Sequence, residues 1–452
     1  MGVSGVFYKK GVWTVIKLFK SLIEPAQNYL SENDNLIAPA AVHGFLAATS
    51  NTPLLIITTS TRHAEELSQE ISSWIGKDLV VNFPAWETLP HERLSPKADT
   101  VTARFKALNK ISDQKVRVIV CSVRALLQPI IANDLNTSII KIQQGLNLQM
   151  QELMNQLIRF GFLRSDLVER RGDFAVRGGI LDIFPADQDH PIRIDFFGDE
   201  IEELSYFSIS DQRSLEKIKV EVSIYPCREM LIDEKLKQKA RTLGKDFPEI
   251  KDLTEKICEG ILFEGMESLA AGLVDDFKSI TDYLSPSTQI WLIDEPRIKS
   301  RAIDLLQTNN EFLQAAWSTV AWSDSKKIEA PIELSNKLKI GGFYELDYIK
   351  QQAEKKKLLL RTLNLYSSDP ADKELDFLDE IESYANKYEK VIFDIKSWKK
   401  QGYVVVFTAA ATGILQRFSE VLNSSEIANQ QISEFDQSIN NELIWLIKSD
   451  IH

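Results

Sequence analysis

One continuous stretch, Leu167 to Leu215, constrains the fold most, because it alternates strand-like segments with strong turn signals. Its Arg177-Gly178-Gly179 run supplies a turn that glycine makes easily, since glycine enters positive φ without a Cβ clash. A strand from Ile180 to Phe184 is stopped by Pro185, and a polar loop leads to a returning strand, Pro191 to Phe197. The stretch therefore predicts a small β domain with antiparallel pairing.

The returning strand is expected to present two unlike faces, because side chains alternate along a strand. The face expected to join the core carries Ile192, Ile194 and Phe196, and the face expected to meet water carries Arg193, Asp195 and Phe197. An aromatic side chain beside an arginine is enriched at the centres of protein interfaces. The alternative interpretation is an edge phenylalanine shielded by arginine stems.

Residues 36 to 131 alternate strand-like and helix-like patterns. Strands are predicted at Leu54 to Thr58, Leu79 to Phe83 and Val116 to Cys121. One helix is predicted after Ser60 and Thr61, which can cap it, and another from Val101 to Ile111. Strands that alternate with helices predict a parallel sheet covered on both faces.

Composition restricts the classes of protein to which the chain can belong. The net charge of −12 argues against a globally basic nucleic-acid binder, although a local basic patch stays possible. The cysteines, Cys121, Cys227 and Cys258, lie far apart and predict neither a disulfide framework nor structural zinc, in keeping with a reducing cytoplasm. No segment reaches the roughly 20 uninterrupted apolar residues of a membrane span, so we expect a cytoplasmic protein without a membrane partner.

Two long runs of unusual residues resemble a known family. The run VERRGDFAVRGGILDIFP, continued by IRIDFFGDEIEELSYFSISDQRSL, resembles the small β domain shared by the excinuclease subunit UvrB and the bacterial transcription-repair coupling factors (Mfd). The run FPAWETLPHERLSPKADTVTARFKAL, Phe83 to Leu108, resembles the coupling-factor branch. The likeness covers about residues 30 to 340 well. Family members are much longer, so the chain is expected to correspond to their N-terminal part.

The resemblance implies a role in transcription-coupled nucleotide excision repair of damaged DNA. It implies that the β domain binds the damage-recognition subunit UvrA through Arg177, Arg193 and Phe197, which stand at the family's contact positions. It further implies that the ATP- and Mg²⁺-dependent DNA translocase, and the parts that bind RNA polymerase and DNA, lie downstream. Two alternatives stay open, an ATP-dependent DNA translocase and a damaged-DNA-binding subunit like UvrB.

The sequence predicts no working nucleotide site, and hence no cofactor and no catalytic residue for this chain. A P-loop requires Gly-x-x-x-x-Gly-Lys-Ser/Thr, whereas the loop from Ala38 to Phe45 has one glycine, no lysine, and a proline that removes an amide. We interpret the fold as helicase-like with a degenerate phosphate loop, in which His43 is a solvated or capping residue. The strand before Asp294 and Glu295 resembles a Walker B strand, but without a P-loop the two carboxylates are expected to be structural.

The remaining patterns divide the chain into four parts. Helices are predicted at Asp252 to Leu273, Arg297 to Leu306, Leu346 to Leu360 and Thr412 to Leu422, with strands at Lys390 to Asp394 and Tyr403 to Thr408. Lys355, Lys356 and Lys357 are expected on a solvated face. The expected parts are an N-terminal extension (1–29), a degenerate UvrB-like α/β domain (30–136 plus 223–340), an inserted β-rich domain (137–222) and a small α/β domain (341–452).

Overall fold

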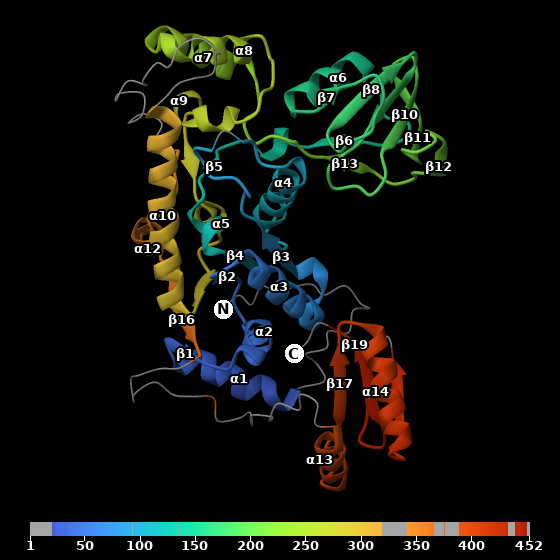
Figure 1. Ribbon diagram of the computed structural model, residues 1–452. Coiled ribbons are helices and arrows are strands. Elements are labelled where there is room, and N and C mark those ends of the chain that lie inside the picture. Colours follow the sequence, from blue (N-terminus) through green and yellow to red (C-terminus); the bar gives the residue numbers. More distant parts are fainter. Residues whose placement is uncertain are drawn as a thin grey trace, which may run out of the picture.

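The computed structural model describes residues 20–318 apart from 93 and 134, residues 341–365, residue 375, and residues 388–432 and 439–449. It contains a parallel six-stranded sheet, an inserted β-rich part and a small three-stranded parallel sheet (Figure 1). The predicted α/β class is confirmed by this arrangement. Within the described ranges, no helix is long and apolar enough to cross a membrane.

The central sheet is parallel throughout, with the strand order β1-β16-β15-β2-β4-β3. Every residue of β2 and of β4 is buried, as expected for strands covered on both faces. The strands are β1 (Asn35–Ile37), β2 (Leu54–Thr58), β3 (Val80–Phe83), β4 (Val118–Ser122), β15 (Gln289–Ile293) and β16 (Leu359–Asn364).

Helices pack against both faces of the central sheet, which confirms the predicted layering. Leu54 and Ile56 of β2 pack on the side of α1, α2 and α3, whereas Leu55 and Ile57 pack on the side of α4, α5, α10 and α12. The bounds are α1 (Lys20–Glu32), α2 (His43–Thr49), α3 (Thr61–Ile75), α4 (Ala98–Ser112), α5 (Val123–Leu127), α10 (Glu295–Ser318) and α12 (Leu346–Lys355). The predicted cap is confirmed, because the Ser60 side chain accepts from the His63 amide.

The predicted boundary at residue 341 is wrong, because α12 and β16 belong to the central sheet. The predicted helix Leu346 to Leu360 ends at Lys355, and the chain turns at Lys357, whose φ is 58°. It then enters the sheet as β16 between β1 and β15. Lys356 is paired rather than merely solvated, since its Nζ contacts an Asp282 oxygen at 2.5 Å.

The inserted β domain is a six-stranded sheet with the order β12-β11-β10-β9-β8-β7, packed on α6 (Met150–Arg159). Its strands are β7 (Leu163–Arg164), β8 (Asp173–Arg177), β9 (Ile180–Ile183), β10 (Ile192–Phe197), β11 (Glu200–Phe207) and β12 (Ser214–Lys217). A two-stranded ribbon of β6 (Ile140–Ile142) and β13 (Val222–Ile224) connects it to the rest of the chain. The expected boundary at residue 222 therefore falls inside this ribbon.

A short helical segment follows the β domain. It contains α7 (Glu234–Asp246), α8 (Lys251–Cys258) and α9 (Ala270–Leu273), and a β5 (Ile130–Ile131) to β14 (Phe277–Lys278) pair closes it. The single helix predicted from Asp252 to Leu273 is wrong, because the chain turns at Gly260 and Gly265, both with positive φ. The helix predicted from Arg297 to Leu306 is longer in the structure, as α10.

The last unit has the sheet order β17-β19-β18, with β17 (Val405–Ala409), β18 (Asn429–Ile432) and β19 (Ile444–Lys448) all parallel. Its helices are α13 (Tyr388–Lys400) and α14 (Thr412–Ser424). The strand predicted from Lys390 to Asp394 is wrong, because these residues form part of α13, whose Ile395 is buried in the core of this unit. The expected N-terminal extension falls mostly outside the described residues.

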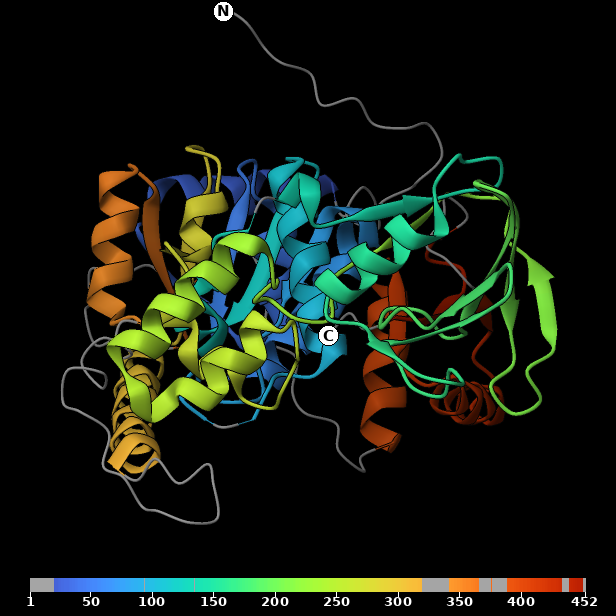
Figure 2. The ribbon, with the colours of Figure 1, turned by 90° about the horizontal axis from the view of Figure 1, so that it is seen from above.

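Polar contacts connect the β domain to α4. The β domain lies on the side of the molecule opposite α10 and α12 (Figure 2). The Thr102 hydroxyl donates to the Pro226 carbonyl at 2.9 Å. Lys106 pairs with Asp187 at 2.8 Å, and Arg171 pairs with Asp99 at 2.9 Å. Asp99, Thr102 and Lys106 of α4 all lie within the run Phe83 to Leu108, so that run contacts the inserted domain.

Candidate partner-binding face of the inserted β domain

The strand register of the β domain defines an outer face turned away from α6. Residues paired across strands point to the same side of a sheet. Two neighbouring outer rows are Ala175, Asp182, Arg193 and Ser205, and then Arg177, Ile180, Asp195 and Glu203. The inner face carries the buried Ile192 and Ile194 and the partly buried Phe196, as the alternation predicted.

Phe197 is the most exposed large apolar side chain of the described residues, with 77% of its surface accessible. It ends β10 on the outer side, and Gly198 with a φ of 63° then turns the chain into β11. An aromatic side chain left this exposed on an ordered strand gains nothing for the fold, and such groups mark binding surfaces.

Arg177 is exposed at the end of β8. Its Nη2 donates to the Asp166 carbonyl at 2.9 Å. Ile180 on β9 pairs with Arg177 on one side and with Asp195 on the other. Asp195 lies between Arg193 and Phe197 on β10. The structure thus brings the three predicted residues onto one face of one sheet, with β9 separating Arg177 from the other two.

Arg193 differs from the expectation of a freely available guanidinium. Its Nε and Nη2 each donate to an Asp182 carboxylate oxygen at 2.8 Å, and its Nη1 donates to the Gln212 carbonyl at 3.1 Å. The guanidinium also lies 4.7 Å from the centre of the Phe207 ring. The hydrogen bond to Asp182 raises the pKa of Arg193, so the charge is permanent and held by this chain.

Asp182, Phe207 and Gln212 were missed by the sequence reasoning, although one signal for Asp182 was present. Alternation in the predicted strand Ile180 to Phe184 puts an acid on the outer face, where a basic cross-strand neighbour is favourable. Register decides which neighbour it meets, and register depends on turn geometry as well as on the hydrophobic pattern of the strand. The structure pairs Arg193 with Asp182 directly.

Asp195 is the one charged member of its row whose side chain has no hydrogen bond or ion pair among the described residues. Burial raises its pKa, with further increases from Glu203, Asp182 and Glu202, and Arg193 opposes them. Glu203 is paired with Lys217. The outer face therefore offers a cation, an exposed aromatic ring and a free carboxylate within a few residues.

The loop that stands where a P-loop would be is closed by the protein itself. It forms a short 3-10 turn (Ala40–Val42) and then α2. His43 is 2% exposed, so the solvated interpretation is wrong; its Nε2 lies 3.0 Å from the Ala38 carbonyl oxygen. The Glu70 carboxyl packs so closely on Gly44 that an added Cβ would lie 2.3 Å from Oε1. Burial lowers the pKa of His43 to about 4 and raises that of Glu70 to about 8.

The Walker-B-like strand is confirmed as β15, and its two carboxylates are paired with basic side chains of the same chain. Asp294 lies 3.1 Å from Arg297, and Glu295 lies 2.8 Å from Lys350 and 3.1 Å from Lys299. No group of three or more His, Cys, Asp or Glu side chains in the part described is arranged to hold a metal ion. These pairings agree with a structural role for both carboxylates.

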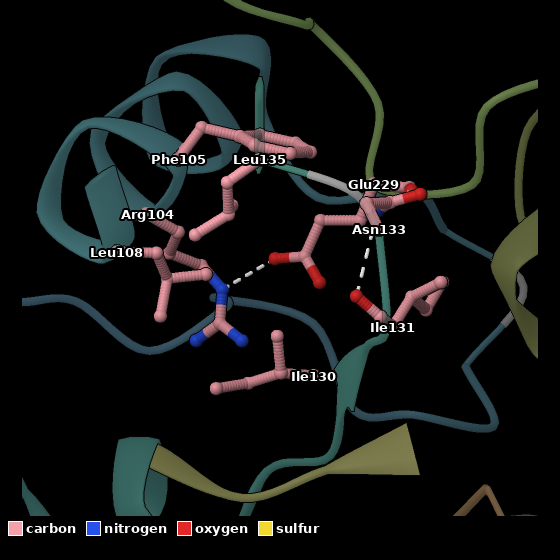
Figure 3. A pocket seen from close by; sticks show the side chains of 8 residues that line it. All are labelled: Arg104, Phe105, Leu108, Ile130, Ile131, Asn133, Leu135 and Glu229. Carbon is pink, nitrogen blue, oxygen red and sulfur yellow. Dashed lines mark hydrogen bonds and ion pairs between the residues drawn. The ribbon is translucent and has the colours of Figure 1, made fainter. Parts of the chain in front are cut away.

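A buried ion pair stands where the β domain joins α4 (Figure 3). Arg104 and Glu229 are 1% and 4% exposed, and the Arg104 Nε donates to a Glu229 oxygen that also accepts from the Trp86 indole at 2.8 Å. Beside the pair is a cavity of about 10 Å³, near the minimum for one water molecule. No pattern in the sequence predicts this pair, because its members are far apart along the chain.

The comparisons agree with this geometry. The model of the UvrB interaction domain matches residues 140–230, which span the sheet, α6 and the β6–β13 ribbon. The transcription-repair-coupling factor of Mycobacterium bovis is 34% identical over 412 residues, 86% of this chain. The chain is a homologue of the transcription-repair-coupling factors.

Two further coupling factors match at lower identity or over less of the chain. That of Bacillus subtilis is 24% identical over 84% of this chain, and that of Escherichia coli is 30% identical over 48%. The matches cover 33% of the M. bovis and B. subtilis proteins and 19% of the E. coli protein. The chain therefore spans about a third or less of the length of the coupling factors it matches.

Proposed function

We propose that this chain recruits UvrA through the outer face of its β domain, as the N-terminal part of a coupling factor in transcription-coupled nucleotide excision repair. The observation that carries the proposal is Phe197, an aromatic side chain 77% exposed on the face that also holds Arg177 and Arg193. The match of residues 140–230 to the UvrB interaction domain supports a partner among the Uvr proteins.

The face has the composition of an interface centre. An exposed ring can be buried in a partner pocket, and Arg177 can form a charge-assisted, bidentate bond to a partner carboxylate. The loop from Ala38 to Phe45 supports recruitment rather than catalysis, since the Glu70 carboxyl fills the space beside Gly44.

The test is a calorimetric titration of purified UvrA from the same organism into the full 452-residue chain. We expect saturable binding that Arg177→Ala weakens by about 2 kcal/mol, roughly thirtyfold. Arg62→Ala is the matched control, because Arg62 is an exposed arginine on α3, outside the β domain. No binding by the wild-type chain, or equal affinities for the two variants, contradicts the proposal.

A further inference from the structure

The loop between β11 and β12, residues 208–213, has a fixed and strained conformation. The Gln212 amide donates to the Ser208 carbonyl at 2.9 Å, and the Ser208 amide donates to the Arg213 carbonyl at 2.9 Å. Gln212 has a φ of 59°, which non-glycine residues adopt only at a cost. Such a backbone persists when surrounding contacts over-determine it.

Arg193 supplies the contact that joins this loop to the outer face. It connects Asp182 on β9, the Phe207 ring on β11 and the Gln212 carbonyl in the loop. Asp182 is 4% exposed, so it cannot reach a partner itself. Three N–H groups of Arg193 are thereby engaged within the domain, and its side chain is 17% exposed.

We infer that Arg193 is a positioning residue that holds residues 208–213 against the outer face, and that Ile209 on this loop is a second contact for the partner. The inference rests on the proposed function. Arg193 and Phe197 are four residues apart on β10, about 13 Å. An ordinary interface buries about 800 Å² on each partner, a patch roughly 30 Å across. A partner seated on Phe197 and reaching Arg193 therefore meets the loop, where Ile209 is 39% exposed.

The contact is tested by UvrA binding to the full chain with Ile209→Ala, compared with Ile303→Ala. Ile303 is an isoleucine 65% exposed on α10, outside the β domain. We expect Ile209→Ala to weaken binding about fivefold or more and Ile303→Ala to leave it unchanged. Equal affinities for the two variants overturn the contact assignment.

The positioning role is tested with Arg193→Lys and Asp182→Asn. Lysine keeps the charge but loses the bidentate bond and the ring contact. We expect each variant to weaken UvrA binding, the double variant to be no weaker than the single ones, and amide hydrogen exchange to accelerate in residues 208–213 while β8 to β10 stay protected. If Arg193 instead contacts the partner directly, Asp182→Asn frees it and binding is unchanged or tighter, which overturns the inference.

The outcomes also separate the inference from the proposed function. If Phe197→Ala weakens UvrA binding while Ile209→Ala does not, the second contact is wrong and the proposed face stands. If neither variant weakens binding, the proposed face itself is wrong. Circular dichroism of each variant confirms that it is folded before binding is compared.

Discussion

At the scale of single residues, Glu70 and His43 show that the loop from Ala38 to Phe45 is part of the protein core. Both are buried in the layer formed by α2 and α3, and neither the Nδ1 of His43 nor the Oε1 of Glu70 has a hydrogen-bond partner among the described residues. The missing lysine and glycines can be read directly from the sequence. Sequence reasoning could not predict that a helix packing against the loop would bury a carboxyl group there, because that contact joins residues far apart in sequence.

Glu70 makes stability depend on pH. Burial raises its pKa from 4.5 to about 8, so the folded chain keeps a proton that the unfolded chain has released. The stabilisation is complete below the unfolded pKa and is lost as pH rises through about 8, at about 1.4 kcal/mol per pH unit in between. We expect Glu70→Gln to gain melting temperature relative to the wild type between pH 5 and pH 9. A constant difference across that range would show that Glu70 is not buried as described.

The Arg104–Glu229 pair should be the costliest single contact to break. Arg104→Met keeps much of the volume but leaves a buried carboxylate unpaired, which costs about 3–5 kcal/mol. Arg62→Met is the control, since its partner Glu66 is exposed and such pairs contribute about 0–1 kcal/mol. Denaturant unfolding measures both; a similar loss for the two variants would contradict the importance of the buried pair.

At the scale of elements, strands and helices with a clear period were predicted and those decided by tertiary contacts were not. β2, β4 and the alternation of β10 follow directly from apolar runs and spacing. Leu359 and Leu360, which begin β16, were predicted as the end of a helix, because no glycine or proline separates them from α12. Their pairing with β15 makes them strand residues. α13 was taken for a strand, since VIFDI is apolar and β-branched, yet packing on one side makes it helical.

The position of β13 gives a prediction about autonomy of the inserted domain. Residues 137–230 include β13 and Cys227, which belong to the domain's core, whereas residues 137–222 stop at the first residue of β13. We expect the longer fragment to unfold in one cooperative thermal transition and the shorter one to melt at a lower temperature or without cooperativity. Indistinguishable melts would show that the ribbon does not support the fold of the sheet.

At the scale of the whole molecule, the chain is expected to bind a partner without hydrolysing ATP. The loop from Ala38 to Phe45 lacks a lysine. The carboxylates that follow β15 are paired with basic side chains: Asp294 with Arg297, and Glu295 with Lys299 and Lys350. We predict no phosphate release above a mock preparation, with or without DNA. Turnover that disappeared in Asp294→Ala would contradict this prediction.

The measurement that tests the central claim most directly is the dissociation constant for UvrA of Phe197→Ala relative to Phe393→Ala in the full chain. Both phenylalanines are highly exposed, at 77% and 72%, but Phe393 lies on α13, outside the β domain. If the outer face binds UvrA, the first variant binds about thirtyfold or more weakly and the second binds as the wild type does. If the two variants bind UvrA equally well, the outer face of the β domain is not the binding surface.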